Sequence, residues 1–257
     1  YATGSKGNLH IIDLGSQEDS IFIKDAHNNV IDDIKLTQDE KYLISGADDG
    51  RLCIWDYSTK QLVKTFEKPA PIEFWNIVFC PNNPDIFITG CSDGSIDLWS
   101  LKTMEHLKTS EKKHSGGVYS MEFAADGKEI ISCSHNNERS MTVRDAAELS
   151  TLDTIENDRP SLISRLAITN DQEYLISGSI DGDLCFWSLK TKEKVHFIEH
   201  AHDSWVWILK LTHNNKYIIT TGVRDNKIKI WDFQNRKHYY TFHTSHETTI
   251  RSVALTK

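Results

Sequence analysis

Short apolar segments alternate with polar turns along residues 27–67. Four such segments, each four to six residues long, occupy Ile31–Leu36, Tyr42–Ser45, Leu52–Trp55 and Leu62–Phe66. Short runs of this length bounded by turn residues are typical of antiparallel strands. Asp49-Gly50 stands between the second and third runs, and Gly supplies the positive φ that a tight hairpin needs. The stretch therefore predicts a unit of four antiparallel strands.

The unit repeats along the chain. Trp55, Trp99, Trp187 and Trp231 are separated by 44, 88 and 44 residues, and the missing position falls near Arg144. A repeat of about 40–45 residues with Trp at a fixed place indicates four-stranded propeller blades, which bury their apolar faces against one another. The blades are expected at residues 27–67, 70–110, 114–155, 159–199 and 202–243, with a sixth made of 246–257 together with 1–25.

These units predict an all-β fold, a six-bladed β-propeller in a single domain over residues 1–257. Pairing of strand 250–256 with strand 1–5 would close the ring and cover an exposed strand edge. The chain starts at Tyr1, within a blade, so a fragment of a longer protein is also expected. A further repeat in that parent would make this chain an incomplete seven-bladed ring.

The repeat resembles the WD40 family over the whole chain. The family's Trp-Asp dipeptide stands at Trp55-Asp56 and Trp231-Asp232, and reads Trp-Ser at Trp99 and Trp187. The resemblance implies a buried hydrogen-bond network in each blade, made of His, Ser or Thr, Asp and Trp. The complete sets are His27, Ser45, Asp49, Trp55 and His202, Thr221, Asp225, Trp231. Two other sets have Ala70 or Arg159 where His belongs, and the blade around Arg144 lacks its Trp.

The resemblance also implies a binding surface on the top face, where each first strand begins. The residues carried over to it are Asp32, Asp48, Glu73, Trp75, Tyr119, Trp205, Trp207, Arg224 and Arg251. Aromatic residues and Arg dominate interface energetics. The acidic members indicate a peptide that carries Arg or Lys, and the two arginines could take a carboxylate or phosphate. In the alternative interpretation, Trp75 and Trp205 only pack between blades.

Charge and cysteine content narrow the class of protein. The formal net charge is −8 and no basic stripe occurs, which disfavours a nucleic-acid partner. No apolar run is long enough for a membrane span, and no signal peptide is recognisable. The five cysteines are odd in number and lack a CxxC spacing, which favours a reduced, intracellular setting. The residues do not distinguish cytoplasm from nucleus.

Candidate catalytic and metal groups have structural explanations. His196, His200 and His202 are closely spaced, but His202 belongs to the implied network and no carboxylate or Cys joins them at ligand spacing. Ser, His and Asp recur as a repeated set, whereas a catalytic nucleophile should be singular. We therefore expect no catalytic residue, metal or cofactor. The favoured function is a non-catalytic scaffold that binds a protein or peptide at the top face, as part of a multiprotein complex. The alternatives are a structural subunit held through blade edges and, less favoured, an enzyme at the channel mouth.

Overall fold

The computed structural model describes residues 2–5, 7–12, 20–69, 72–111, 114–134, 139–159, 161–244, 250 and 252–253. These residues form 23 β-strands and one short 3-10 helix, η1 (Ala125–Gly127). The strands assemble into six antiparallel sheets, five of four strands and one of three. The all-β class and the repeating four-stranded sheet are therefore as predicted.

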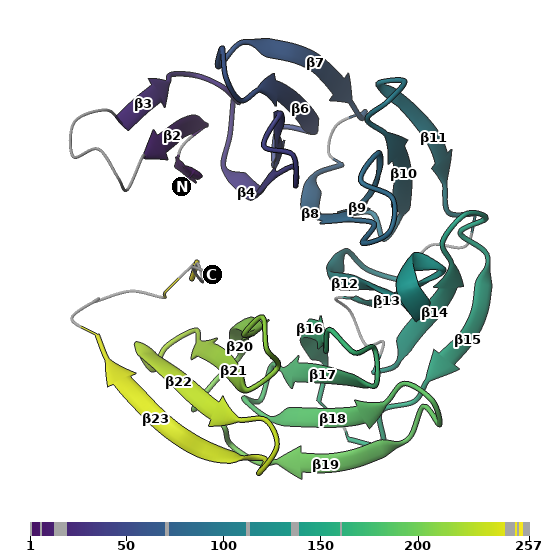
Figure 1. Cartoon of the computed structure of the whole chain (residues 1–257), viewed down its shortest axis with the longest axis vertical. Helices are drawn as coiled ribbons and strands as arrows, with labels where there is room; N and C mark the ends of the chain where they lie inside the picture. The colour runs from purple at the N-terminus through teal and green to yellow at the C-terminus, as the bar shows by residue number, and fades with distance from the viewer. Residues whose placement is uncertain are drawn as a thin grey trace. The chain divides into compact units, whose positions relative to one another are not determined.

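The chain divides into two compact units. The first comprises residues 1–118 and 147–149, and the second comprises 119–146 and 150–257. Figure 1 shows the three-stranded sheet of the first unit in purple and its four-stranded sheets in blue to teal. The strands are β1 (Ala2–Ser5), β2 (Asn8–Ile12), β3 (Ser20–Ile23), β4 (Ile31–Leu36), β5 (Tyr42–Ala47), β6 (Arg51–Asp56), β7 (Leu62–Glu67), β8 (Phe74–Phe79), β9 (Ile86–Cys91), β10 (Ile96–Ser100) and β11 (Glu105–Thr109).

The second unit holds three sheets of four consecutive strands, of which β16–β19 are side by side in green in Figure 1. The first residue of β12, Val118, belongs to the first unit, and the rest of this strand belongs to the second. The strands are β12 (Val118–Ala124), β13 (Glu129–Ser134), β14 (Met141–Asp145), β15 (Thr151–Ile155), β16 (Ile163–Ile168), β17 (Tyr174–Ser179), β18 (Leu184–Ser188), β19 (Lys194–Ile198), β20 (Val206–Leu211), β21 (Tyr217–Gly222), β22 (Lys227–Asp232) and β23 (Lys237–His243).

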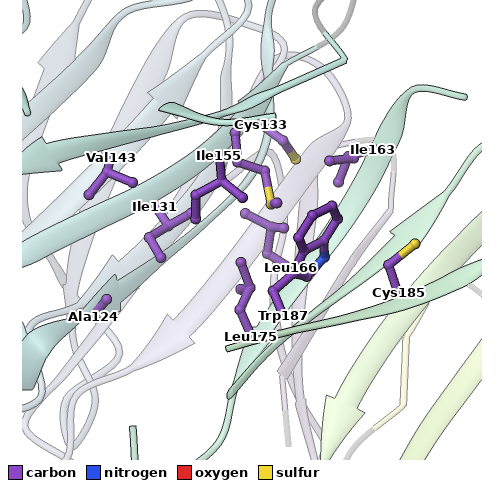
Figure 2. Close-up of a cluster of buried hydrophobic side chains, with 11 residues drawn as sticks. Ala124, Ile131, Cys133, Val143, Ile155, Ile163, Leu166, Leu175, Cys185 and Trp187 are labelled. Carbon is purple, nitrogen blue, oxygen red and sulfur yellow. The ribbon is translucent and has the colours of Figure 1, made fainter. Parts of the chain in front are cut away.

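Burial follows strand position within each sheet. The two middle strands are almost wholly buried in β4–β7, whereas the fourth strand β7 is largely exposed; β22, a middle strand of β20–β23, is an exception in which only Trp231 is buried. The repeated Trp packs on core residues of the preceding sheet, so that Trp187 shares a cluster with Ile131 and Val143 (Figure 2). The apolar core therefore lies between consecutive sheets, which is the physical reason that the sheets need neighbours.

A β-bulge recurs where the first strand of a sheet meets the second. The pairing skips one residue between Ile31 and Asp33 in β4, and the same skip leaves out Trp75, Ser164 and Trp207 in three other sheets. A bulge inserts one unpaired residue and re-aims its side chain. Asp32, Trp75 and Trp207 thus leave the ladder at the positions where the sequence predicted a binding surface.

The predicted ring closure is not tested. Most of the expected strand 250–256 lies outside the residues that the structure describes. Ala70, at the His position of its set, and Arg251, a predicted binding residue, also lie outside them. β1 pairs with β2, and the sheet β1–β3 lacks a fourth strand among the described residues. Ring closure and the single-domain interpretation stay predictions.

Candidate functional site

The sheet β4–β7 contains a buried hydrogen-bond network with the predicted members. The Trp55 indole N–H donates to Ser45 Oγ at 3.0 Å, and Ser45 Oγ lies 2.7 Å from His27 Nε2. The other ring nitrogen, His27 Nδ1, is 3.1 Å from Asp49 Oδ1. Burial lowers the pKa of His27 against the opposing effect of Asp49, so the neutral ring suits this relay. The network gives hydrogen-bond partners to polar side-chain groups whose burial without partners would destabilise the fold.

The sheet β20–β23 has the same network, but its hydroxyl belongs to Thr220, so the prediction of Thr221 is wrong. Trp231 Nε1 donates to Thr220 Oγ1 at 2.8 Å, and His202 Nε2 lies 2.7 Å from the same oxygen. His202 Nδ1 also pairs with Asp225. The hydroxyl precedes the Trp by 11 residues here and by 10 in β4–β7, because this hairpin is one residue longer.

The two sheets without the His keep the Trp contact. Trp99 donates to Thr89 Oγ1 and Trp187 donates to Ser177 Oγ, both at 2.9 Å. Arg159 stands at the His position of β16–β19, and Asp181, which precedes Gly182 as Asp49 precedes Gly50, is exposed. The Arg159 guanidinium lies 3.6 Å from the buried Asp183 and 3.0 Å from Glu199. In the sheet β12–β15, buried Arg144 donates to Thr151 Oγ1 at 3.1 Å.

A fully buried carboxylate, Asp97, occupies the sheet β8–β11. Its Oδ2 is 2.6 Å from Lys68 Nζ and accepts from the Cys91 thiol at 3.4 Å, and its Oδ1 accepts from Thr109. Burial raises the pKa of Cys91 to about 12, so the thiol stays a donor. Burial opposes the charge of Lys68, but the attraction and hydrogen bond of the Asp97 carboxylate act against burial, and the pKa of this ammonium is raised. Asp97 and Lys68 thus form a desolvated ion pair.

Four predicted binding residues come together in the first unit, and we call Asp32, Asp48, Glu73 and Trp75 the first-unit rim. The indole N–H of half-buried Trp75 donates to Glu73 Oε2 at 2.8 Å. A Cβ added at Gly117 would lie 2.1 Å from Trp75 Cζ3, so the indole packs directly on the Gly117 backbone. Trp75 is therefore held in place by Glu73 and Gly117 and still has solvent contact.

The carboxyls of the first-unit rim interact strongly. Desolvation, then a hydrogen bond with Asp48 and repulsion from Asp48, Glu73 and Asp33, raise the pKa of Asp32 to about 9. Asp32 itself is exposed, so solvent screens part of the repulsion from its neighbours. Like charges crowded in this way are relieved by a proton or by a bound cation.

This crowding predicts a pH-dependent stability. A carboxyl whose pKa is raised on folding contributes stability below its unfolded pKa, about 4, and that contribution is lost as the pH rises toward the folded value of about 9. The variant Asp32→Asn cannot ionise. Its melting temperature should therefore rise relative to that of the wild type between pH 5 and pH 9, as thermal denaturation would show. A difference that stays constant with pH would contradict the crowding.

Aromatic residues gather separately in the second unit, and we call Tyr119, Trp205, Trp207 and Arg165 the second-unit rim. The Tyr119 and Trp205 rings are 6.1 Å apart, and the Arg165 guanidinium lies 4.5 Å from the Trp207 ring. Arg165 also donates to the carbonyl oxygens of Trp207 at 2.7 Å and Tyr119 at 3.4 Å. The three aromatic side chains are half-buried.

The position predicted for Arg224 is occupied by Val223. The Val223 amide donates to the Trp205 carbonyl at 3.0 Å, as the Asp48 amide does to Val30 in the first unit. Arg224 follows one residue later and is exposed. The extra hairpin residue that takes Thr221 out of the network also shifts Arg224 by one position. Arg251 lies outside the described residues.

Polar side chains that bridge adjacent sheets were missed by sequence reasoning. Asp33 accepts from the Ile77 amide at 2.9 Å, and Asn76 donates to the Val118 carbonyl at 2.7 Å. In the second unit, Ser120 accepts from the Leu166 amide at 3.1 Å, and Arg165 donates to the Trp207 carbonyl at 2.7 Å. Asp33, Asn76 and Arg165 each follow the bulge position of their strand. A polar residue inside an otherwise apolar first strand was the available signal.

Over the described ranges, no group of three or more His, Cys, Asp or Glu side chains is arranged to hold a metal ion. The five cysteines are buried thiols. None of the helical structure that the coordinates define is long and apolar enough to cross a membrane.

The chain belongs to the WD40 family. The family model for the WD domain, G-beta repeat, matches residues 19–56, 105–138, 150–188 and 192–232, which together cover more than half of the chain. Each match begins at the last strand of one sheet and continues into the next sheet, and three of the four end one residue after a Trp of the network, at Trp55, Trp187 and Trp231. The sheets are therefore blades of the β-propeller class.

Similar proteins share part of this repeat region. U3 small nucleolar RNA-interacting protein 2 of Mus musculus is 31% identical over 105 residues, covering 37% of this chain and 22% of the relative. A Lissencephaly-1 homolog of Caenorhabditis briggsae is 28% identical over 36% of this chain and 23% of its own length. U3 small nucleolar RNA-associated protein 12 of Saccharomyces cerevisiae is 37% identical over 60 residues, which cover 23% of this chain and 6% of the relative. The matches thus span less than a quarter of each relative.

Proposed function

We propose that the protein is a non-catalytic interaction scaffold that binds a protein or peptide segment carrying Lys or Arg at the first-unit rim. The observation that carries the proposal is the half-buried indole of Trp75 beside the crowded carboxyls of Asp32, Asp48 and Glu73. A cationic side chain can lay its apolar stem on the indole and place its charge among the carboxylates.

The rigidity of the site favours binding. Trp75 is fixed by its hydrogen bond to Glu73 and its packing on Gly117, and Asp32 projects from a bulge in a paired strand. Little side-chain entropy remains to be lost when a partner docks, which increases the affinity available from a small contact. Binding a cation would also displace the proton favoured by Asp32, so affinity should increase with pH.

The second-unit rim supports the same function with different chemistry. Tyr119, Trp205 and Trp207 offer aromatic surface, and Arg165 is fixed among them by backbone carbonyls. Aromatic residues and Arg are the usual anchors of protein interfaces. We expect the second-unit rim to contribute additional contacts to a protein partner. The acidic first-unit rim would determine that the partner carries Lys or Arg.

The comparisons support a scaffold role. The WD40 family is a family of interaction scaffolds, and the names of the relatives include proteins that interact or associate with the U3 small nucleolar RNA. We propose an intracellular protein that works within a multiprotein complex through protein contacts. The net charge of −8 supports a protein partner over a nucleic-acid groove. The competing role, a subunit held through its blade edges, would use outer strands such as β7 instead.

A peptide ligand can be obtained by selecting a displayed random peptide library for binding to this chain. Substitution at the first-unit rim should weaken the binding of that peptide. Trp75→Ala is expected to weaken affinity about thirtyfold, since truncating an aromatic anchor commonly costs about 2 kcal/mol. Asp32→Asn should have a smaller effect and reduce the salt dependence of binding. Isothermal titration at two salt concentrations measures both.

The matched control is Val63→Ala, which removes an exposed apolar side chain from the outer strand β7 of the same unit. This variant should bind as the wild type does. Loss of affinity in Val63→Ala with full affinity in a folded Trp75→Ala would instead support the blade-edge role. Thermal melts of each variant establish that it is folded.

A further inference from the structure

The outer strand of the sheet β20–β23 exposes three large aromatic side chains. Tyr239, Tyr240 and Phe242 are 59%, 52% and 47% exposed. β23 is the last strand of its sheet, drawn in yellow in Figure 1, and no strand within the described ranges pairs with its outer edge. An edge of this kind presents main-chain N–H and C=O groups with which another strand can pair.

The outer edges of the other four-stranded sheets are protected. In each outer strand the pairing skips one residue, and the residue after the skip is Lys64 in β7, Lys108 in β11 and Asp153 in β15. A charge at this place opposes pairing with another chain, because pairing would desolvate it. In β19 the last three residues are half-buried. β23 has Tyr240 at this position and continues to His243 without Lys, Arg, Asp or Glu, so it lacks the protection of the other edges.

The sheet β20–β23 is also the basic part of the chain. Residues 204–244 hold seven Lys and Arg and two Asp, a formal net charge of +5 in a chain whose total is −8. Lys237 begins β23 directly after Arg236. Lys227 and Lys229 lie on the paired strand β22. Pairing of two β23 edges from two copies of the chain would bring like charges together, whereas an acidic segment would be attracted.

The aromatic rings of β23 are arranged for a protein segment and not for nucleotide stacking. The Tyr240 and Phe242 rings are 4.7 Å apart at an interplanar angle of 72°, and the Tyr239 ring lies 4.9 Å from that of Tyr217. Each ring thus has another ring against part of its surface, whereas a nucleic-acid base stacks on an open ring face. Because Tyr240 and Phe242 are two residues apart in a strand, they share one face and form a joint apolar surface.

We propose that an extended acidic segment of a partner protein adds to β23 as a fifth strand. The main chain of the segment pairs with the edge from Tyr240 to His243, and its apolar side chains pack on Tyr240 and Phe242. Its carboxylates are attracted by the Lys and Arg side chains of the sheet. Main-chain hydrogen bonds supply the affinity in this mode of recognition, and side-chain contacts supply the specificity. The site is separate from both rims and does not rest on the proposed function.

The test is a titration of the whole chain with the synthetic peptide acetyl-Glu-Val-Glu-Val-Glu-Val-Glu-Val-amide, followed by NMR of the backbone amides. The amide signals of residues 240–243 should shift in a saturable manner, and hydrogen exchange in this segment should slow, because paired amides are protected from water. The same peptide with Lys in place of Glu should bind at least about tenfold more weakly, since it meets like charges. A single-stranded oligouridylate should bind more weakly than the acidic peptide.

The variant Tyr240→Lys tests the edge itself, because it supplies the charge that β7 and β11 carry after the skipped residue. It should bind the acidic peptide about tenfold more weakly. The added positive charge would strengthen a purely electrostatic attraction, so weaker binding separates strand pairing from attraction by charge alone.

Two variants of the first unit are controls for the location, and Lys64→Ala and Trp75→Ala should both bind the acidic peptide as the wild type does. Absence of saturable shifts, shifts without slower exchange, or equal affinity for the acidic and basic peptides would overturn the proposal. Tighter binding of the oligouridylate, or stronger peptide binding by Tyr240→Lys, would overturn it as well. The amide spectrum of each variant without peptide establishes that it is folded.

Discussion

Replacing Asp97 with alanine should lower the free energy of unfolding by about 3–5 kcal/mol, the largest effect expected for a single residue here. Asp97 is fully buried, and its carboxylate is the counter-ion of Lys68, whose side chain is only 15% exposed. The variant leaves the Lys68 ammonium desolvated, together with the Cys91 and Thr109 donors that Asp97 now accepts from. Chemical denaturation followed by tryptophan fluorescence measures the change.

The matched control is an exposed ion pair of the same unit, Lys108 with Glu148, whose side chains are 35% and 70% exposed. Lys108→Ala should cost less than about 1 kcal/mol, because solvent screens such pairs. Similar losses in the two variants would show that burial of Asp97 does not determine its contribution. Removing one partner of a buried ion pair costs far more stability than removing one partner of an exposed pair.

The second large effect distinguishes two adjacent threonines of β21. Thr220→Val should destabilise the protein by about 1–3 kcal/mol, because it leaves the Trp231 N–H and His202 Nε2 without their shared hydroxyl. Thr221→Val should be neutral or stabilising, because Thr221 Oγ1 is buried and has no hydrogen-bond partner in the described part of the chain. Both changes have the same size and shape.

Paired denaturation curves of the two threonine variants give the comparison directly. Equal midpoints, or a greater loss for Thr221→Val, would show that the hydroxyl in the network is assigned to the wrong residue. Asp225→Ala should destabilise the protein about as much as Thr220→Val does, since it removes the acceptor for His202 Nδ1.

The repeating sheets were predictable because their signals are local and periodic. Strand β9 occupies Ile86–Cys91, as its apolar run predicts, and Trp99 marks the third strand as Trp55 does. Each sheet must bury two faces against neighbours, so the apolar period is preserved even where the Trp is replaced by Arg144. Local turn chemistry, such as Asp49 before Gly50 with φ 75°, fixes the hairpins.

Positions that depend on hairpin length were not predictable by counting. Thr221 and Arg224 were both placed one residue too far along the chain, because the hairpin between β21 and β22 holds an extra residue. Strand pairing absorbs that residue in the turn, and the network then selects Thr220 by geometry. The bridging roles of Asp33, Asn76 and Arg165 were also missed, because they join sheets whose strands are about one repeat apart in sequence.

Hydrogen–deuterium exchange with and without a selected peptide ligand tests the central claim, that partners bind where the inner strands begin. The account predicts slower exchange at residues 30–33 and 73–76, which flank the first-unit rim, with no change in the outer strands β7 and β11. Protection confined to those outer strands, with unchanged exchange at the rim, would contradict it.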